Sequence, residues 1–238
     1  MLSKLEERMN VMKEWNQMPA WMQNEAVRQY YDILKQRRSG LRIKRSMDVV
    51  LSVILIIFFL PLMLVVGVLI KRDSHGPIFF RQVRITTYGR RFRIWKFRTM
   101  VQEAAKLGGE ITTLEDRRIT KIGMRLRKYR IDEIPQLFNV LSGEMSFVGT
   151  RPEVEKYVRK YTDEMKATLL LPAGLTSMAS IKYKDEEQLL QNAAEVDKTY
   201  IEAVLPDKME YNLKELKNFN CWSDIKTMVK TITSVIGS

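Results

Sequence analysis

The longest apolar stretch of the chain runs from Val49 to Ile70 and contains no charged residue. As one straight α-helix, its roughly 22 residues would be about 33 Å long, close to the ~30 Å thickness of a bilayer's hydrocarbon core. Because the stretch is apolar on every side, it favours contact with lipid over burial in a soluble core. Pro61 lies just past its middle and disfavours helical geometry there.

Basic residues flank this stretch on both sides. Lys44 and Arg45 precede it, and Lys71 and Arg72 follow it. Lys and Arg beside a membrane segment favour the cytoplasmic side, so a simple span would place one cluster on the unfavoured side. A re-entrant helix-break-helix satisfies both clusters, since two arms of about 16 Å each match one leaflet. The residues favour re-entry. A helix that spans the membrane remains the alternative, because proline is tolerated in membrane-spanning helices.

The remaining pattern predicts an α+β fold that is mainly helical. Apolar and basic residues alternate from Ile78 to Met100 around the turn residues Tyr88-Gly89, which predicts a small β-hairpin. Helical spacing recurs over residues 1–40, over 120–141 with an interruption at Pro135, and over 153–171. The tail, residues 222–235, has the spacing of an amphipathic helix that packs on the core or lies at a membrane interface.

These elements together predict a monotopic membrane protein in three parts. Residues 1–43 form an N-terminal helical extension, and residues 44–72 form the re-entrant membrane helix. Residues 73–238 form a cytoplasmic domain that includes the hairpin and the amphipathic interfacial helices.

Composition limits the partners and the chemistry. The chain has 40 Lys and Arg against 28 Asp and Glu, a formal net charge of +12, which favours nucleic acid, an anionic membrane or phosphorylated substrates. With one cysteine, Cys221, and one histidine, His75, an internal disulfide is excluded, and a zinc site or a histidine-based triad is disfavoured. Any catalysis must therefore rest on carboxylates, basic groups and the backbone.

The candidate chemistry lies in the stretch RIDEIPQLFNVLSGEMSFVGTRPE. Asp132 and Glu133 precede Pro135, a residue favoured in the first turn of a helix, so both carboxylates are expected at a helix start. An acidic helix cap would explain the pair through the helix dipole alone. Basic residues on both sides, among them Arg127 and Arg151, instead indicate a site for an anionic ligand such as a diphosphate. Carboxylates among cations, without histidine, favour metal-assisted phosphoryl chemistry.

The same stretch, with KRSMD before the apolar segment and with GPIFFRQVR and WKFRTM after it, resembles the monotopic phosphoglycosyl transferases, a bacterial sugar transferase family. The resemblance runs from about Lys44 to the C-terminal helix. It implies a re-entrant membrane helix with its break at a proline, here Pro61, in the bacterial inner membrane, with the catalytic domain on the cytoplasmic face. It also implies transfer of a sugar-1-phosphate from a UDP-sugar to polyprenyl (undecaprenyl) phosphate.

The resemblance further implies roles for individual residues. Asp132 would be the nucleophile that attacks the sugar-bearing phosphorus, expels UMP and forms an aspartyl phosphosugar. Glu133, together with Asp132, would bind the metal cofactor, Mg²⁺ or alternatively Mn²⁺. The positions matching the family's substrate-binding residues are Lys96, Arg127, Arg151 and Pro152.

Some positions depart from the family pattern. Thr150 replaces the first proline of the usual Gly-Pro-Arg-Pro, and PAGLTS stands where the family has Pro-Gly-Ile-Thr-Gly. Asn212 aligns with a family aspartate and Glu215 with an aromatic residue. An amide coordinates Mg²⁺ less strongly than a carboxylate, which puts the third element of the metal site in question.

Two functions from other classes remain as alternatives. One is a non-catalytic, basic, membrane-anchored binding protein, and the other is a nucleic-acid binder suggested by charge and by RRFRIWKFR. Neither explains the apolar stretch and the Asp-Glu block together. The expected partners are therefore a UDP-sugar, polyprenyl phosphate and membrane lipids, with a homodimer as a further candidate and no nucleic acid. The sequence does not identify the sugar or the glycan pathway.

Overall fold

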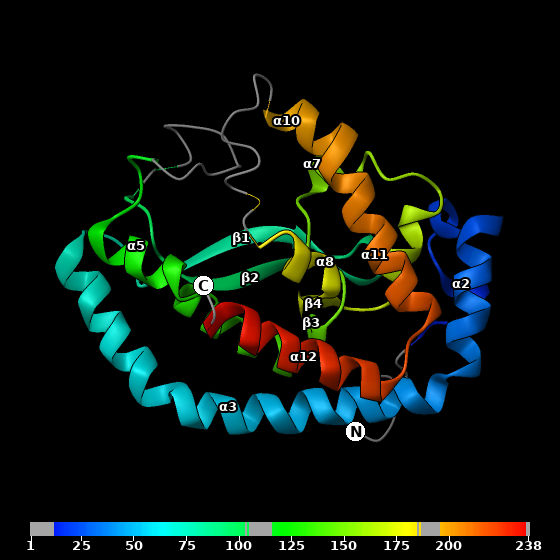
Figure 1. Cartoon of the computed structure of the whole chain (residues 1–238), viewed down its shortest axis with the longest axis horizontal. Helices are drawn as coiled ribbons and strands as arrows, with labels where there is room; N and C mark the ends of the chain where they lie inside the picture. The colour runs from blue at the N-terminus through cyan, green and yellow to red at the C-terminus, as the bar shows by residue number, and fades with distance from the viewer. Residues whose placement is uncertain (1–11, 103, 105–115, 185, 187–195, 237–238) are drawn as a thin grey trace.

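One long helix, α3 (Arg38–Asp73), runs along one side of the molecule. A computed structural model describes residues 12–102, 104, 116–184, 186 and 196–236 of the chain. Figure 1 shows α3 as a curved rod, with α12 (Cys221–Ile236) beside it and the remaining elements gathered on the same side. Helix α3 and the rest of the described chain therefore share a long line of contact.

The predicted membrane helix is present and extends beyond the apolar stretch at both ends. Of its most apolar window of 18 residues, 22% is buried by the rest of the protein, whereas the core helix of a soluble protein is mostly buried. Helical geometry continues through Pro61, so the expected break is not seen, and the ribbon instead curves in its C-terminal half (Figure 1). Proline lacks the N–H donor and crowds the preceding turn, which bends a helix without having to end it.

The predicted β-hairpin is confirmed. Strand β1 (Phe79–Ile85) pairs antiparallel with β2 (Arg91–Phe97), with Phe79 opposite Phe97 and Ile85 opposite Arg91. The turn is left-handed at Tyr88, with φ 58°, and at Gly89, with φ 76°. A Cβ atom on Gly89 would lie 2.6 Å from the ring of Trp21, so only glycine fits beneath that side chain.

A second, two-stranded sheet was not predicted. Strand β3 (Met145–Val148) pairs parallel with β4 (Ala173–Thr176). The helix expected over residues 153–171 is wrong, because that segment forms only the short helix α7 (Glu155–Val158) and the 3₁₀-helix η5 (Met165–Leu170) before β4 begins. Strands of four residues, nearly all buried, give no alternating pattern that would reveal them in the sequence.

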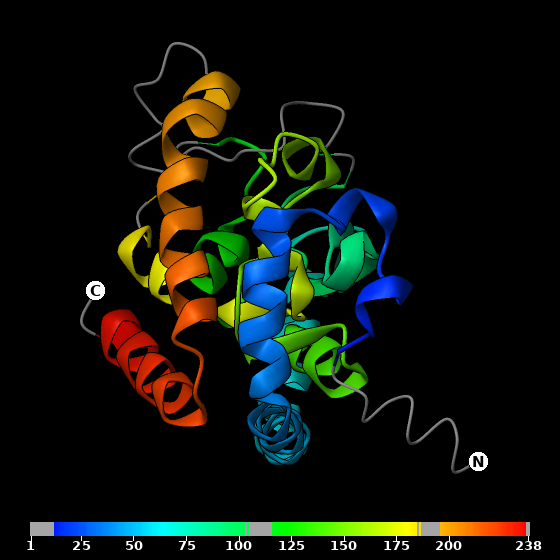
Figure 2. The ribbon, with the colours of Figure 1, turned by 90° about the vertical axis from the view of Figure 1, so that its right-hand side faces the viewer.

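The N-terminal extension packs against the core through one face of helix α2 (Glu25–Gln36). The side chain of Asn24 accepts a hydrogen bond from the Val27 N–H and so caps the helix. Figure 2 shows α2 beside the long helix α11 (Leu205–Lys217), which packs against it. Residues 1–11 of the expected extension lie outside the described residues.

Further short elements complete the described chain. Two 3₁₀ turns precede α2, and the hairpin turn is itself a short 3₁₀ segment. A π-helical turn joins α10 to α11. The remaining short helices and helical turns of the described chain are η1 (Trp15–Gln17), η2 (Ala20–Met22), η3 (Thr87–Gly89), α5 (Lys121–Lys128), η4 (Ile131–Gln136), α6 (Leu137–Ser142), α8 (Met178–Lys182), α10 (Val196–Thr199) and η6 (Tyr200–Val204).

Buried polar contacts join the start of α3 to the rest of the protein. Lys44 donates to Asp224 of α12 at 2.6 Å and to the last carbonyl of β3 at 2.8 Å. Asp48 accepts a hydrogen bond from the Phe147 N–H, and Arg45 donates to two carbonyls of α6. The KRSMD motif therefore links the start of α3 to α6, β3 and α12 through hydrogen bonds and an ion pair.

Helix α12 buries polar and apolar side chains on one face. Asp224 and Thr227 are buried, and Met228 packs against the hydrophobic core. The exposed side chains include Lys226, Lys230, and the apolar residues Trp222, Val229 and Ile232, which are 65%, 55% and 59% exposed. The tail helix therefore packs on the core through one face and leaves large apolar side chains exposed elsewhere on its surface.

Candidate active site

Asp132 and Glu133 lie in the first turn of η4, between α5 and α6. Arg130, with φ 56°, adopts the left-handed conformation and turns the chain just before the pair. The prediction that both carboxylates occupy a helix start is confirmed. The interruption of the helical segment comes at Arg130, not at Pro135, because Pro135 is accommodated inside η4.

Glu133 forms ion pairs with two cationic side chains from different parts of the chain. Its Oε1 accepts from Lys96 Nζ at 2.9 Å and from Arg151 Nη2 at 2.5 Å, and its Oε2 lies 3.4 Å from Arg151 Nη1. Burial alone would raise the pKa of Glu133, but Arg151 and Lys96 outweigh it and hold that pKa well below its usual range. Glu133 is therefore an ionised carboxylate whose two oxygens both have protein partners.

Asp132 lies in a different environment from its neighbour Glu133. It is 7% exposed, and its buried Oδ1 has no hydrogen-bond partner. Burial raises the pKa of Asp132, and the nearby positive charges of Lys96 and Arg127 oppose that rise. A buried polar atom without a partner is costly in a folded protein, and at a helix start among cations it points to a ligand.

Strand β2, which carries Lys96, is hydrogen-bonded to α6. The side chain of Asn139 accepts from the Trp95 N–H at 2.9 Å and donates to the Arg93 carbonyl at 3.1 Å. The two bonds hold the strand on either side of Ile94, directly before Lys96. Sequence reasoning missed Asn139, which is fully buried in the described structure.

Arg151 is placed by the sheet that was not predicted. The Gly149 N–H donates to Thr176 O and the Gly174 N–H donates to Thr150 O, which extends the pairing of β3 and β4 up to Arg151. A Cβ atom on Gly174 would lie 2.1 Å from Gly149 O, so the two backbones approach more closely than a side chain would permit.

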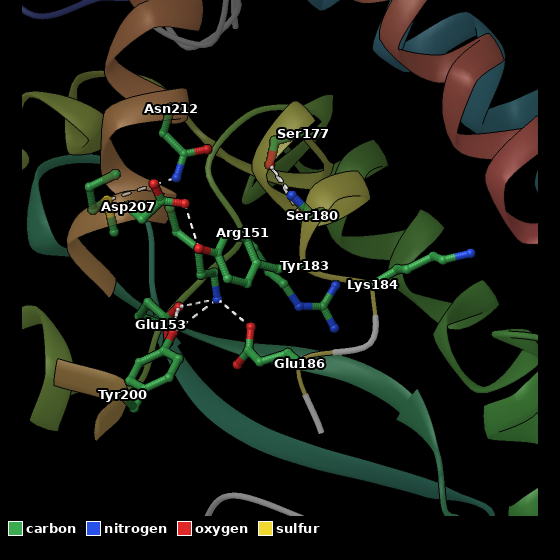
Figure 3. A network of polar contacts seen from close by, with 12 residues as sticks. Arg151, Glu153, Ser177, Ser180, Tyr183, Lys184, Glu186, Tyr200, Asp207 and Asn212 are labelled. Carbon is green, nitrogen blue, oxygen red and sulfur yellow. Dashed lines mark hydrogen bonds and ion pairs between the residues drawn. The ribbon is translucent and has the colours of Figure 1, made fainter. Parts of the chain in front are cut away.

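A buried polar network includes Glu153, two residues after Arg151, and residues from later segments of the chain. Lys208 Nζ is 2.9 Å from Glu186 and 3.5 Å from Glu153, and Tyr200 donates to Glu153 at 2.5 Å (Figure 3). Glu133 first, and then Glu186 and Glu153, raise the pKa of Arg151, so this guanidinium stays charged. The network was missed because its members are far apart in sequence and form no motif.

The other two predicted substrate positions differ in placement. Arg127, on α5, is half-buried and close enough to Asp132 for its charge to affect that carboxyl. Pro152 is buried, and its carbonyl accepts from Arg84 at 3.3 Å. The fold therefore brings Lys96, Arg127 and Arg151 to the carboxylate pair, while Pro152 contributes to the packing of the loop behind them.

Comparison with known proteins agrees with this arrangement. The family model described as bacterial sugar transferase matches residues 39–238. The chain belongs to the bacterial sugar transferase family. The match begins just after α2, so the packed N-terminal extension lies almost entirely outside it.

Three relatives named as undecaprenyl-phosphate sugar phosphotransferases are similar to this chain over about four fifths of its length. The chain is 38% identical, over 82% of its length, to the UDP-N-acetylgalactosamine-undecaprenyl-phosphate N-acetylgalactosaminephosphotransferase of Aeromonas hydrophila, and covers 44% of that protein. It is 31% identical, over 80% of its length, to the UDP-glucose:undecaprenyl-phosphate glucose-1-phosphate transferase of Escherichia coli, covering 39% of it. It is 33% identical to the UDP-glucose:undecaprenyl-phosphate glucose-1-phosphate transferase of Caulobacter vibrioides, over 81% of this chain and 69% of that protein. The chain thus spans less than half the length of the first two relatives.

Asn212, which aligns with a family aspartate, lies on α11. It is buried, its amide nitrogen lies 3.8 Å from Met209 Sδ, and its Oδ1 has no partner. It lines a cavity of about 40 Å³ with Lys44, Glu215 and Asp224, and that cavity includes neither Asp132 nor Glu133. Burial raises the pKa of Glu215 to about 7.

The carboxylate pair offers oxygen donors of the kind that Mg²⁺ prefers. Asp132 Oδ1 is buried without a partner, and Glu133 is ionised beside it. Within the described ranges, no group of three or more His, Cys, Asp or Glu side chains could hold a metal ion. The residues present therefore fit a hard divalent cation, with the protein supplying only part of its coordination.

Proposed function

We propose that this chain transfers a sugar-1-phosphate from a UDP-sugar to undecaprenyl phosphate and releases UMP. Family membership and the named activities of the relatives support the reaction class. The observation that carries the proposal is the asymmetry of the Asp132–Glu133 pair. One carboxylate is buried with an oxygen that has no partner, and the other is neutralised by two cations.

The pair suits a two-step transfer through Asp132. In the first step Asp132 Oδ1 attacks the sugar-bearing phosphorus, the bond from that phosphorus to the bridging oxygen breaks, and UMP leaves with the electron pair. In the second step a phosphate oxygen of the lipid attacks the same phosphorus, and the Asp132 carboxylate is released. Each step exchanges one phosphorus–oxygen bond for another, so no oxidant or reductant is needed.

The surrounding cations have distinct tasks in this scheme. Lys96 and Arg127 favour the ionised form of Asp132, which is the nucleophilic form. Arg151 presents a planar group that can bind phosphate through two nitrogens. Asp132 and Glu133 would hold Mg²⁺, which would neutralise charge on the diphosphate as UMP leaves.

The lipid acceptor requires a site at the membrane surface. Apolar side chains are exposed on α12 (Trp222, Val229, Ile232) and on α3, which contacts α12 and in which Ile57 and Phe58 are 68% and 71% exposed. We infer that this surface enters one leaflet of the bacterial inner membrane and that α3 re-enters on the cytoplasmic side. The basic residues at both ends of its apolar stretch and the Pro61 position support that topology.

A panel of UDP-sugars tests the proposed reaction. The purified chain, in detergent micelles with undecaprenyl phosphate and Mg²⁺, should release UMP from at least one donor and form a lipid-linked sugar diphosphate. A panel that covers N-acetylgalactosamine, glucose and galactose donors reflects the activities of its relatives. Tight binding of a UDP-sugar without UMP release would favour the non-catalytic binding protein instead.

A further inference from the structure

In the free protein, the Glu133 carboxylate, which a divalent cation would bind, is already paired with two cationic side chains. Glu133 accepts from Lys96 at 2.9 Å and from Arg151 at 2.5 Å, and its side chain is 12% exposed. A metal ion that binds Glu133 must therefore displace or share at least one of these ammonium or guanidinium groups. Such an exchange costs Coulomb energy in a site that is partly shielded from water.

The charges of the site explain when the exchange becomes favourable. The charges of Lys96, Arg127, Arg130 and Arg151 act on the two carboxylates, so the site carries net positive charge before any ligand binds. A divalent cation alone would add to that positive charge. A diphosphate that arrives with the cation carries one negative charge on each of its two phosphates in a UDP-sugar and offsets the charge of the metal.

The number of ligands gives an independent argument. Mg²⁺ takes six ligands and is usually bound by one or two carboxylates together with substrate phosphates and water. Among the described residues no third carboxylate, cysteine or histidine joins Asp132 and Glu133. Asn212, which aligns with a family aspartate, lines a separate cavity. Phosphate oxygens are therefore the ligands best able to complete the coordination.

We propose that the metal and the donor diphosphate bind as a coupled pair, through an exchange of partners at Glu133. In the free protein Glu133 is paired with Lys96 and Arg151. When both ligands bind, the metal takes Glu133, and the two cations turn to the phosphates. Because coupling between two ligands is reciprocal, each one strengthens the binding of the other by the same factor. The choice of a diphosphate as the second ligand rests on the proposed function.

Binding of UDP measured by calorimetry tests the coupling without turnover, because UDP carries no sugar to transfer. UDP is expected to bind at least about tenfold more tightly with saturating Mg²⁺ than in EDTA. Uridine, which lacks phosphates, should show no such dependence. By electron paramagnetic resonance, nucleotide-free protein should bind Mn²⁺ at least about tenfold more weakly than UDP-bound protein does.

A variant of Lys96 tests the exchange itself. Lys96→Met removes one partner of Glu133, so Mn²⁺ should bind the nucleotide-free variant more tightly than it binds the wild-type protein, while UDP in EDTA binds more weakly. Lys160→Met removes the same charge from an exposed position and should leave both affinities unchanged. Equal UDP affinity with and without Mg²⁺ in the wild-type protein, or unchanged Mn²⁺ affinity in Lys96→Met, would overturn the proposal.

The outcome is separable from that of the proposed function. If UMP release from a UDP-sugar is observed but UDP and Mg²⁺ bind independently, the coupling is rejected and the transfer reaction stands. If the coupling is observed but no UDP-sugar yields UMP, the transfer reaction is rejected and the coupled site stands.

Discussion

Arg151 Nη2 lies 2.5 Å from Oε1 of Glu133 and thereby joins the loop after β3 to the first turn of η4. The contact leaves Glu133 ionised while its neighbour Asp132 keeps a buried oxygen without a partner. Two adjacent carboxylates thus acquire different properties from their surroundings. This division is what a nucleophile and its electrostatic partner require.

The first prediction concerns the guanidinium of Arg151. Arg151→Lys keeps the charge but loses the planar pair of nitrogens, so kcat/KM for the UDP-sugar should fall by about tenfold, and Arg151→Met should lower it further. Steady-state UMP release measures the effect. Arg159→Lys alters an exposed arginine on the surface and serves as the control. An Arg151→Met enzyme with wild-type kcat/KM would exclude this residue from substrate binding.

The second prediction concerns the buried ion pair between α3 and α12. Lys44→Met leaves Asp224 buried without its counter-charge, which should lower the free energy of unfolding by about 3–5 kcal/mol. The double variant Lys44→Met/Asp224→Leu should recover part of that loss. Thermal unfolding in detergent measures both. Asp32→Asn breaks an exposed pair on α2 and should cost about 0.5 kcal/mol or less. A Lys44→Met protein as stable as Asp32→Asn would show that the pair does not anchor α3.

The third prediction concerns the pH dependence of stability. Burial raises the pKa of Glu215 from its usual value near 4.5 to about 7, and the groups that face this carboxyl are the Met178 N–H, Asp224, Thr227 and Lys44. The folded state therefore binds the proton more tightly than the unfolded state. The stability that this group contributes is fully present below about pH 4.5 and is lost as the pH rises through about 7.

Glu215→Gln should remove that part of the pH dependence. At pH 8 the variant should be more stable than the wild-type protein by on the order of 2 kcal/mol, because the wild-type protein must then ionise a buried carboxyl. Unfolding curves from pH 5 to pH 8 measure the difference. Glu210→Gln changes an exposed residue of the same helix and is the matched control. If Glu215→Gln and Glu210→Gln gave parallel curves, Glu215 would not be the titrating group.

The sequence predicted some elements well because their patterns are local. The hairpin showed itself by alternation around Tyr88-Gly89, and the apolar helix by length alone. The Asp-Glu block was singled out as the candidate site, and the structure brings Lys96 and Arg151, which the resemblance implied as substrate-binding residues, into contact with Glu133. In each case the signal lies within one short stretch or one motif.

Other features could not be predicted because they depend on contacts between distant segments. The pairing of β3 with β4 joins Met145 to Ala173, and each strand is too short to show a period. The network of Glu153, Tyr200 and Lys208 joins three segments of the chain. Asp224 of α12 is buried because its carboxylate pairs with Lys44 of α3. The spacing of apolar residues along α12 cannot predict a partner in another helix.

The fourth prediction concerns topology. Both ends of the apolar stretch should lie on the cytoplasmic side, and exposed positions are needed to test this because Lys44 is buried. In a Cys221→Ser background, cysteines at Arg42 and Lys71, both exposed, should resist a membrane-impermeant maleimide in intact cells and react after permeabilisation. Labelling of either position from outside would contradict re-entry. Pro61→Leu should favour a straight helix that spans the membrane and so expose the Lys71 position outside.

The most direct test of the account is the mass of the protein after the first half-reaction. Incubated with its UDP-sugar and Mg²⁺ but without lipid, the protein should release UMP and gain one phosphosugar, mapped to the peptide that contains Asp132. Asp132→Asn keeps the size of the side chain and should lose both the adduct and turnover, with unchanged thermal unfolding. Glu133→Gln should form the adduct more slowly and need more Mg²⁺. Substantial turnover by Asp132→Asn, or UMP release that needs the lipid and leaves no adduct, would contradict the account and favour direct transfer to the lipid.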